Sequence, residues 1–455
     1  MTTPIEDYEG VAPEPAPQVP RARFSGVVAR LTAVNFLVMA LGVVTGPLTA
    51  RALGPSGRGA LAAIVVPFTL APLILSFGLP SYANRQAARD RDLGALLGVL
   101  ALLCLAISAI GAALAFPLSA LLAQGRHVVH VYLLAGLLLV PLGLLNVVLF
   151  GVANGLQRWN TLVFSRLTAP LLGLVATVVL YVLGLLTVAS AALLTLISVT
   201  ISIAPLLPVL RDCGRPRLNW RLVREASSFG GRAWLGQVSS IALDRLDQLL
   251  MITLVSERQL GLYAVAVTLA SLPSTLSAAI VSALTPRIAQ GEHWMAARTV
   301  RVAMALTALG AIALAVVAPW FLPLLFGRGF RDAVPIAWIL FVASVPGQAA
   351  WVLGAALTSA GRPGTSTIGA LGGVVASVVG LLLLLGPLAG IGAALVTLVA
   401  NGVVFTLYVV AWRRHFGGRV REFVLIRPED VASAASLART QLRPLVRLAG
   451  RSAPA

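Results

Sequence analysis

The chain has 455 residues, of which 58% are hydrophobic and only 11% are charged, and this composition excludes an ordinary soluble domain. All 34 basic residues are arginine, so the chain has no lysine for a Walker A nucleotide loop or a Schiff base, which argues against an ATP-driven pump. The net charge of +18 would indicate nucleic acid in a soluble protein, but here it is spread over short loops, and we expect no nucleic-acid partner.

Runs without charged residues predict membrane-spanning helices, because one span needs about 20 mainly apolar residues. In chain order these runs are 31–50, 59–84, 93–125, 127–157, 167–210, 259–286, 302–327, 333–361 and 363–412. Two of them, 167–210 and 363–412, are long enough for two helices each, with turn residues at Gly184 and at Gly386 and Pro387. With 233–255, which is apolar apart from three charges, the count is twelve helices.

Arginine is distributed unevenly over the predicted loops. If the termini are cytoplasmic, 26 arginines lie inside and 6 outside, which is the asymmetry expected of a multi-pass protein of the inner (cytoplasmic) cell membrane. Residues 1–25 are acidic and proline-rich at their start, typical of a disordered leader. Residues 414–455 form a basic tail, either solvated or lying as a helix on anionic lipid.

An internal repeat divides the membrane region into two halves. A shift of 202 residues superposes loop and turn positions, so we expect a six-helix lobe over 26–211, a cytoplasmic linker over 212–232 and a second lobe over 233–413. The predicted fold is all-α, with twelve transmembrane helices in two bundles related by a pseudo-two-fold axis along the membrane normal, as in secondary transporters. The superposed pairs include Arg30 with Arg232, Gly59 with Gly261, Arg126 with Arg328, and Gly184 with Gly386.

Three charges in the seventh predicted helix break this repeat. Asp244, Arg245 and Asp247 lie inside a span, where the first helix has apolar or small residues. A charge at mid-bilayer costs roughly 2.5 to 3.5 kcal/mol, so such groups normally face a wet cavity or one another. We interpret them as a cavity-lining anion and proton site, and the alternative is a local ion-paired cluster or one that reaches the interface.

Other arginines are candidate substrate contacts. Arg166 lies just inside the fifth span without a nearby carboxylate, and either extends to the membrane surface or meets a phosphate bidentately. Arg51 and Arg58 flank a short glycine-rich outer loop, where they could contact an anionic head group or be solvated. Small residues four apart, such as Gly94 and Gly98, predict close helix packing. We expect no metal site and no catalytic residue.

Two motifs resemble a known family. The stretch from Thr49 to Gly59, Thr-Ala-Arg-Ala-Leu-Gly-Pro-Ser-Gly-Arg-Gly, resembles the "ARxLGPxxxG" signature of polysaccharide flippases in the multidrug/oligosaccharidyl-lipid/polysaccharide export superfamily. The charged stretch from Asp244 and the later Leu-Gly-Leu-Tyr-Ala-Val-Ala over 260–266 are similar to that family's seventh helix and its "LGxYAxA" motif.

This resemblance implies a V-shaped transporter that moves a polyprenyl-diphosphate-linked oligosaccharide, a precursor of cell-surface polysaccharide, from the inner to the outer leaflet by alternating access. Its partners would be that glycan, membrane lipid, and a polymerase or glycosyltransferase; it would need no cofactor apart from a coupling ion, H⁺ or Na⁺. A cation-coupled drug exporter of the same superfamily and a non-transporting scaffold are alternatives. An enzyme is disfavoured, because the longest inside loop, 211–232, holds only Asp212 and Glu225 as carboxylates.

Overall fold

The structure is a computed structural model that describes residues 21–89, 92–273, 288, 290–425, 427 and 429–430. Most of the acidic leader and the arginine-rich end of the tail therefore lie outside the described residues. The described part is helical and contains no strand. Its helices are α1 (Arg21–Leu75), α2 (Leu79–Arg89), α3 (Leu93–Ala123), α4 (His127–Leu138), α5 (Val140–Gly155), α6 (Trp159–Val182), α7 (Val188–Ile201), η1 (Ala204–Leu206), α8 (Pro208–Cys213), α9 (Trp220–Leu254), α10 (Glu257–Ala270), α12 (Met295–Phe326), η2 (Arg328–Phe330), α13 (Ala333–Ser359), α14 (Pro363–Phe416) and α15 (Arg421–Val424).

These helices account for the twelve predicted spans. Seven segments of the described chain are long and apolar enough to cross a membrane. Two of those segments contain a non-helical residue, Gly54 in α1 (φ 66°) and Ala389 in α14 (φ 45°), so each holds two spans. The pair α4 and α5, bent by 44°, makes one more. The two remaining predicted spans fall on α9 and on α10, of which the described part has 14 residues.

The reversal inside α14 lies slightly later than its sequence suggests. Gly373 lies against Val404 and Gly380 against Val396, so the two halves pack antiparallel. The turn falls at Ala389 and not at Gly386 and Pro387, which remain helical. A Cβ added to Gly390 would lie 2.8 Å from the Ile336 side chain, so glycine at this position lets α14 pack closely on α13 directly after the turn. The other predicted turn, at Gly184, is confirmed by its φ of 69° between α6 and α7.

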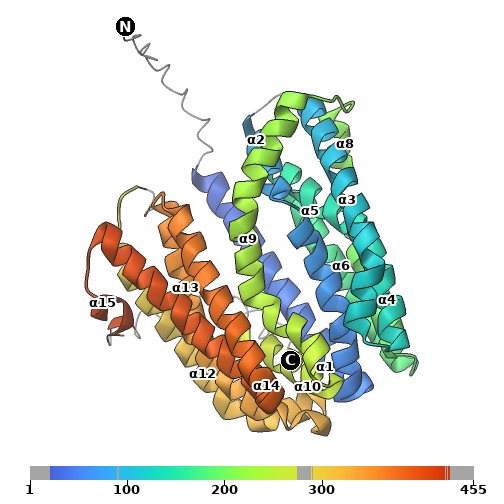
Figure 1. The fold of residues 1–455 in the computed structure, drawn as a ribbon, viewed down its shortest axis with the longest axis vertical. Helices are drawn as coiled ribbons and strands as arrows, with labels where there is room; N and C mark the ends of the chain where they lie inside the picture. The colour runs from blue at the N-terminus through green and yellow to red at the C-terminus, as the bar shows by residue number, and fades with distance from the viewer. Residues whose placement is uncertain are drawn as a thin grey trace, which may run out of the picture.

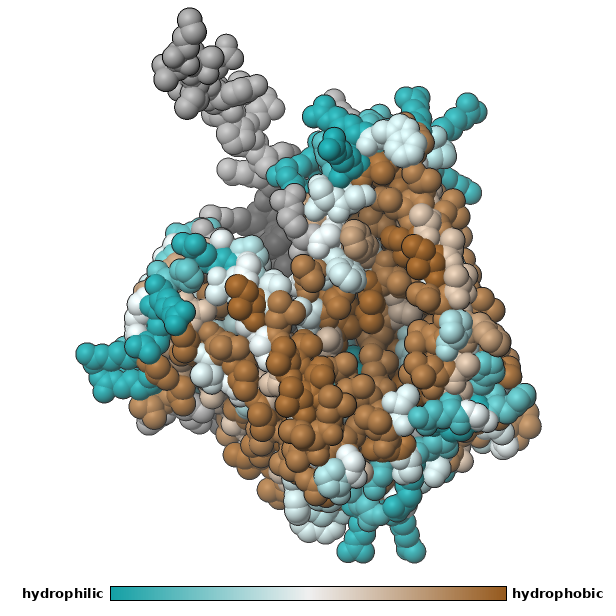
Figure 2. All heavy atoms as spheres, viewed as in Figure 1, coloured by the Kyte–Doolittle hydropathy of each residue, from teal (hydrophilic) through white to brown (hydrophobic). Residues whose placement is uncertain are grey.

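The molecule has two lobes, an N-lobe of α1 to α8 and a C-lobe of α9 to α15, arranged as a V (Figure 1). The lobes part towards the end where α1 begins, here called the amino-terminal side, and meet at the opposite side. The space-filling view shows the surface hollowed between the lobes on the amino-terminal side (Figure 2). The predicted V-shaped fold is therefore confirmed.

The hydrophobic cores explain where the lobes meet. One cluster of buried residues includes Ala63 and Ala191 of the N-lobe together with Tyr263 and Leu340 of the C-lobe, so it joins the two lobes. A second cluster is built from the N-lobe and the start of α9, and a third from the C-lobe with the tail residue Phe423. Burial of apolar surface therefore holds the lobes together at one end and leaves each lobe with a separate core at the other.

Candidate substrate pathway between the lobes

Helix α9 bridges the two lobes. In its first half, Trp234 Nε1 donates a hydrogen bond to the Ile74 carbonyl at 2.6 Å, and Gln237 Nε2 reaches the Leu73 carbonyl at 3.5 Å. In its second half, the Leu243 side chain packs on Gly373 of α14. The three charges that break the repeat follow directly after Leu243, so α9 places them where the lobes diverge.

Asp247 belongs to a buried polar cluster of the C-lobe. The hydroxyl of Tyr263 on α10 donates a hydrogen bond to Asp247 Oδ2, and it also lies 3.2 Å from Thr397 Oγ1 on α14. Thr397 Oγ1 in turn donates to the Ala393 carbonyl at 3.0 Å. Tyr263 is fully buried. The sequence indicated Asp247 but not the roles of Tyr263 and Thr397, because their contacts join residues from three helices.

Asp244 and Arg245 lie outside this cluster. Both side chains are exposed, and within the described residues neither takes part in a hydrogen bond or ion pair, so the predicted alternative of an ion-paired cluster is not formed there. Asp244 lies seven residues after Gln237, and this two-turn spacing puts it on the face of α9 that Gln237 directs towards the N-lobe. Arg245 nevertheless interacts electrostatically with Asp244 and Asp247 on the same helix, without a direct ion pair to either.

Arg166 lies on the N-lobe where α6 packs along the first half of α1. Its Nη1 donates to Asn35 Oδ1 at 3.0 Å, and its guanidinium carbon lies 5.1 Å from the centre of the Phe150 ring. One further contact of the same kind joins Arg30 Nη1 to Asn160 Oδ1 at 2.8 Å. Both arginines are exposed and have neutral amide partners, so their charges stay uncompensated. The sequence had indicated Arg166 but not the role of Arg30.

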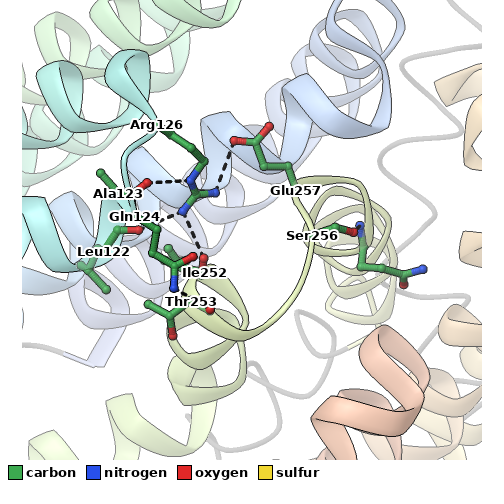
Figure 3. Close-up of polar contacts among 9 residues, drawn as sticks. Leu122, Ala123, Gln124, Arg126, Ile252, Thr253, Ser256 and Glu257 are labelled. Carbon is green, nitrogen blue, oxygen red and sulfur yellow. Dashed lines mark hydrogen bonds and ion pairs between the residues drawn. The ribbon is translucent and has the colours of Figure 1, made fainter.

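The lobes are tied together at the opposite side by Arg126 (Figure 3). Within the N-lobe, Nε donates to the Ala123 carbonyl at 2.8 Å and Nη2 to the Leu122 carbonyl at 2.9 Å. Across to the C-lobe, Nη2 reaches the Ile252 carbonyl at 3.1 Å and Nη1 pairs with Glu257 Oε1 at 3.3 Å. Cations are favoured at the carboxyl ends of helices, and this one occupies the ends of both α3 and α9.

The predicted contacts Arg51 and Arg58 also lie towards the opposite side and not beside Arg166 or Arg245. Arg51 donates from Nε to the Leu325 carbonyl at 2.8 Å and from Nη2 to the Leu324 carbonyl, so it binds the carboxyl end of α12. Arg58 is half-buried, and its Nε has no partner among the described residues. A role for either in binding substrate stays a prediction.

No group of three or more histidine, cysteine, aspartate or glutamate side chains in the described ranges could hold a metal ion. What the pathway offers is a set of guanidinium groups with amide and carbonyl partners, one half-buried carboxylate bonded to the fully buried Tyr263, and two exposed charges on α9. Such a set can bind an anion by charge-assisted hydrogen bonds and can exchange a proton at a carboxylate.

Known proteins resemble this chain in sequence and in fold. A sequence model of the family described as "Polysaccharide biosynthesis protein" matches residues 27–292. No curated protein matches the whole sequence closely enough to be counted as a relative. Among solved structures, the chain is similar to the lipid II flippase MurJ in an inward closed conformation, at 12% identity and a TM-score of 0.69, covering 91% of this chain and 99% of that one.

Two drug transporters are similar as well. One is a multidrug resistance MATE family transporter of the MOP superfamily in an inward-facing conformation, with 16% identity, a TM-score of 0.66, and coverage of 91% of this chain and 99% of that one. The other is the MATE multidrug transporter DinF-BH, with 18% identity, a TM-score of 0.59 and the same coverage. At such identities the likeness concerns the fold.

Proposed function

This chain belongs to the polysaccharide biosynthesis protein family, and we propose that it moves a polyprenyl-diphosphate-linked oligosaccharide from the cytoplasmic to the outer leaflet by alternating access. At the coarser level, it is a membrane transporter of the flippase and drug-exporter superfamily and not an enzyme. The structure would then represent the form open to the cytoplasm, because the predicted orientation makes the amino-terminal side cytoplasmic.

The observation that carries this proposal is a series of exposed guanidinium groups on α1, α6 and α9, at different depths, that form no ion pair among the described residues. Helical rise puts Arg30 roughly 32 Å, Arg166 with its partner Asn35 roughly 24 Å, and Arg245 roughly 10 Å from the opposite side. None of the three has a carboxylate partner among the described residues. A diphosphate that descends this series meets one cation after another, each able to replace part of its hydration shell.

The chemistry of the site favours an anionic cargo over a cationic drug. A lipid-linked diphosphate can keep its prenyl chain in the membrane while only its head group enters the space between the lobes. The structural likeness to a lipid II flippase supports this proposal, whereas the likeness to MATE drug transporters supports the alternative. Arg30 and Arg166, whose side-chain partners are neutral amides, are the feature that distinguishes the two, because they would repel a cationic drug.

Asp247 supports proton coupling in preference to Na⁺ coupling. Its contacts beyond α9 form one chain, from Asp247 Oδ2 to the Tyr263 hydroxyl, the Thr397 hydroxyl and the Ala393 carbonyl, while its Oδ1 accepts a hydrogen bond from the Gln248 amide at 2.6 Å. With Asp247 ionised, two hydroxyl protons serve three contacts, so one contact lacks a proton. With Asp247 protonated, each contact has its own proton. This cluster can therefore hold an added proton without rearranging its heavy atoms.

The test is leaflet accessibility of a fluorescent undecaprenyl-diphosphate glycan in proteoliposomes. Native protein is compared with Arg30→Gln, Arg166→Gln and Arg245→Gln, and with Arg362→Gln as a control on the exposed inner end of the C-lobe. Loss of one charge-assisted hydrogen bond, about 1.5 to 3 kcal/mol, predicts a roughly tenfold or greater fall in transfer rate for the three pathway variants only. Native protein that leaves the probe in place, or that expels a cationic dye equally well in all variants, would refute the glycan proposal.

A further inference from the structure

Residues 214–221, here called the linker, join α8 to α9 and include the first two residues of α9; they form an exposed cationic and apolar surface at the amino-terminal side. All eight residues are exposed. Three are the arginines 215, 217 and 221. Between them stand two large apolar side chains, Leu218 at 52% and Trp220 at 69% exposure, which a surface facing only water would not favour.

The described structure holds this segment firmly on α3. The Arg217 amide donates to the Gly94 carbonyl at 3.0 Å. A Cβ at Gly94 would lie 2.6 Å from the Arg215 carbonyl oxygen, and one at Gly98 would overlap the Arg217 carbonyl. Close packing at Gly94 and Gly98 is therefore confirmed, but the predicted partner, another helix, is wrong. The two glycines lie against the backbone of the linker. The segment presents its side chains from a fixed support.

The length of α3 predicts that this segment lies at the depth of the lipid head groups. Gly98 lies 25 residues before the end of α3 at Ala123, which is about 38 Å by helical rise. The hydrocarbon core is about 30 Å thick, and the head-group regions extend the total to about 40 to 45 Å. With Ala123 at the opposite boundary, Gly98 and the linker lie beyond the hydrocarbon. Tryptophan is enriched at this level.

The nearby carboxylates leave the linker cationic. Asp212 pairs with Arg158 at 2.8 Å, and so serves an arginine outside the segment. Glu225 lies 3.4 Å from Arg221, but the side chain of Arg221 is 86% exposed, and such a surface pair is weak. Among the described residues, Arg215 and Arg217 have no side-chain partner. Their charge is available to a ligand.

We propose that linker 214–221 binds the head groups of anionic phospholipids in the leaflet on the amino-terminal side. The three guanidinium groups contact lipid phosphates, and Trp220 and Leu218 enter the boundary between head groups and acyl chains. Lipid is favoured over an acidic protein because apolar side chains stand at head-group depth. The proposal rests on membrane insertion and not on the transported glycan, so the two can fail separately.

The first test measures lipid retention by the full-length protein. Protein is released from nanodiscs containing equal phosphatidylcholine and phosphatidylglycerol, and the bound lipids are counted by native mass spectrometry, without any glycan present. The variant with Arg215→Gln, Arg217→Gln and Arg221→Gln is compared with a variant of equal charge change on the C-lobe, Arg298→Gln, Arg362→Gln and Arg414→Gln. We expect the linker variant to lose at least half of the retained phosphatidylglycerol and the control to keep it.

A second measurement separates the geometry from the charge. Gly98→Ala displaces the linker without removing an arginine, so we expect it to lower phosphatidylglycerol retention as well. Phosphatidylglycerol that is brominated near the head-group end of its acyl chains should quench tryptophan fluorescence. We expect this quenching to be stronger in the native protein than in the Trp220→Phe variant. Equal retention in the native protein and the linker arginine variant would overturn the proposal and leave an acidic protein as the partner class. Equal loss in both arginine variants would also overturn it, because charge alone would then suffice.

Discussion

Gly59 and Gly261 occupy equivalent positions in the repeat, and each lies against the backbone that precedes the other. A Cβ at Gly59 would overlap the Glu257 carbonyl oxygen, and a Cβ at Gly261 would overlap that of Pro55. Glu257 follows Pro55 by the same 202 residues that separate the glycines. Helices α1 and α10 therefore cross in a self-complementary contact at the pseudo-two-fold axis, close enough for backbone to touch backbone.

We expect Gly59→Ala or Gly261→Ala to destabilise the junction of the lobes. Each added methyl must push the helices apart, and overpacking typically costs about 1 to 3 kcal/mol. The measurement is the thermal unfolding midpoint in detergent. Gly42→Ala is the matched control on the same helix, because nothing lies within 4 Å of its Cβ position. Equal midpoints for all three variants would contradict a tight crossing.

Arg126 should hold the opposite side closed. We expect Arg126→Gln to open that side, because the side chain binds carbonyls on both lobes. Glu257→Gln should have a smaller effect, since the contact from Arg126 to the Ile252 carbonyl across the lobes remains. Spin labels at His127 and Arg331, both exposed, report the separation across the lobes, and the two native cysteines are buried.

A second label pair, at Arg89 and Arg362, reports the amino-terminal side. Alternating access requires this distance to shorten as the first one lengthens. A lengthening of both distances in Arg126→Gln would indicate loss of packing instead of a shift between two states.

The tail should detach from the C-lobe as pH falls. Arg301, buried at 7% exposure, donates from Nε to Asp430 Oδ2 at 2.7 Å and from Nη1 to the Glu422 carbonyl at 2.5 Å. Burial alone would raise the pKa of Asp430, but hydrogen bonds from Arg301 and the Arg427 amide, with the charges of both arginines, outweigh it and hold the pKa below its usual value.

The lowered pKa of Asp430 determines how attachment of the tail depends on pH. A lowered pKa in the folded state stabilises attachment fully above the ordinary aspartate pKa of about 3.9 and loses that stabilisation as pH falls below it. Limited proteolysis after Asp430 should therefore accelerate below about pH 4 in the native chain. Asp430→Asn should be cleaved faster at neutral pH and show little pH dependence, because it leaves a buried arginine unpaired. A native profile that is flat down to pH 3 would contradict this.

Tyr263→Phe tests proton coupling without altering a charge. The variant removes the hydroxyl that links Asp247 to Thr397, so we expect transport driven by a proton gradient to fall at least tenfold and transport without a gradient to persist. Thr406→Val is a control on α14, where the exposed hydroxyl bonds only within its own helix. Equal sensitivity to an imposed Na⁺ gradient would point to sodium instead.

Local properties of the sequence predicted most of the fold. The twelve spans follow from apolar runs, and the two lobes follow from a repeat of glycine and arginine positions, because insertion in a membrane depends on the composition of each segment. The contacts between side chains could not be predicted from the sequence in the same way. Arg126 was identified only as an outer loop position of the repeat and Arg301 only as an inside charge, yet each binds residues more than 120 positions away. Charge in a sequence predicts which side of the membrane a loop faces, but not its partner.

The attachment of α9 has a consequence for how force passes through the protein. Its first half is bonded to the N-lobe through Trp234 and Gln237, and its second half packs on α14 through Leu243. When the angle between the lobes changes, the helix between Gln237 and Leu243 must take up the difference as curvature. Arg245 lies two residues beyond that stretch, so a ligand that pulls on its guanidinium acts on a helix whose other end is fixed to the opposite lobe.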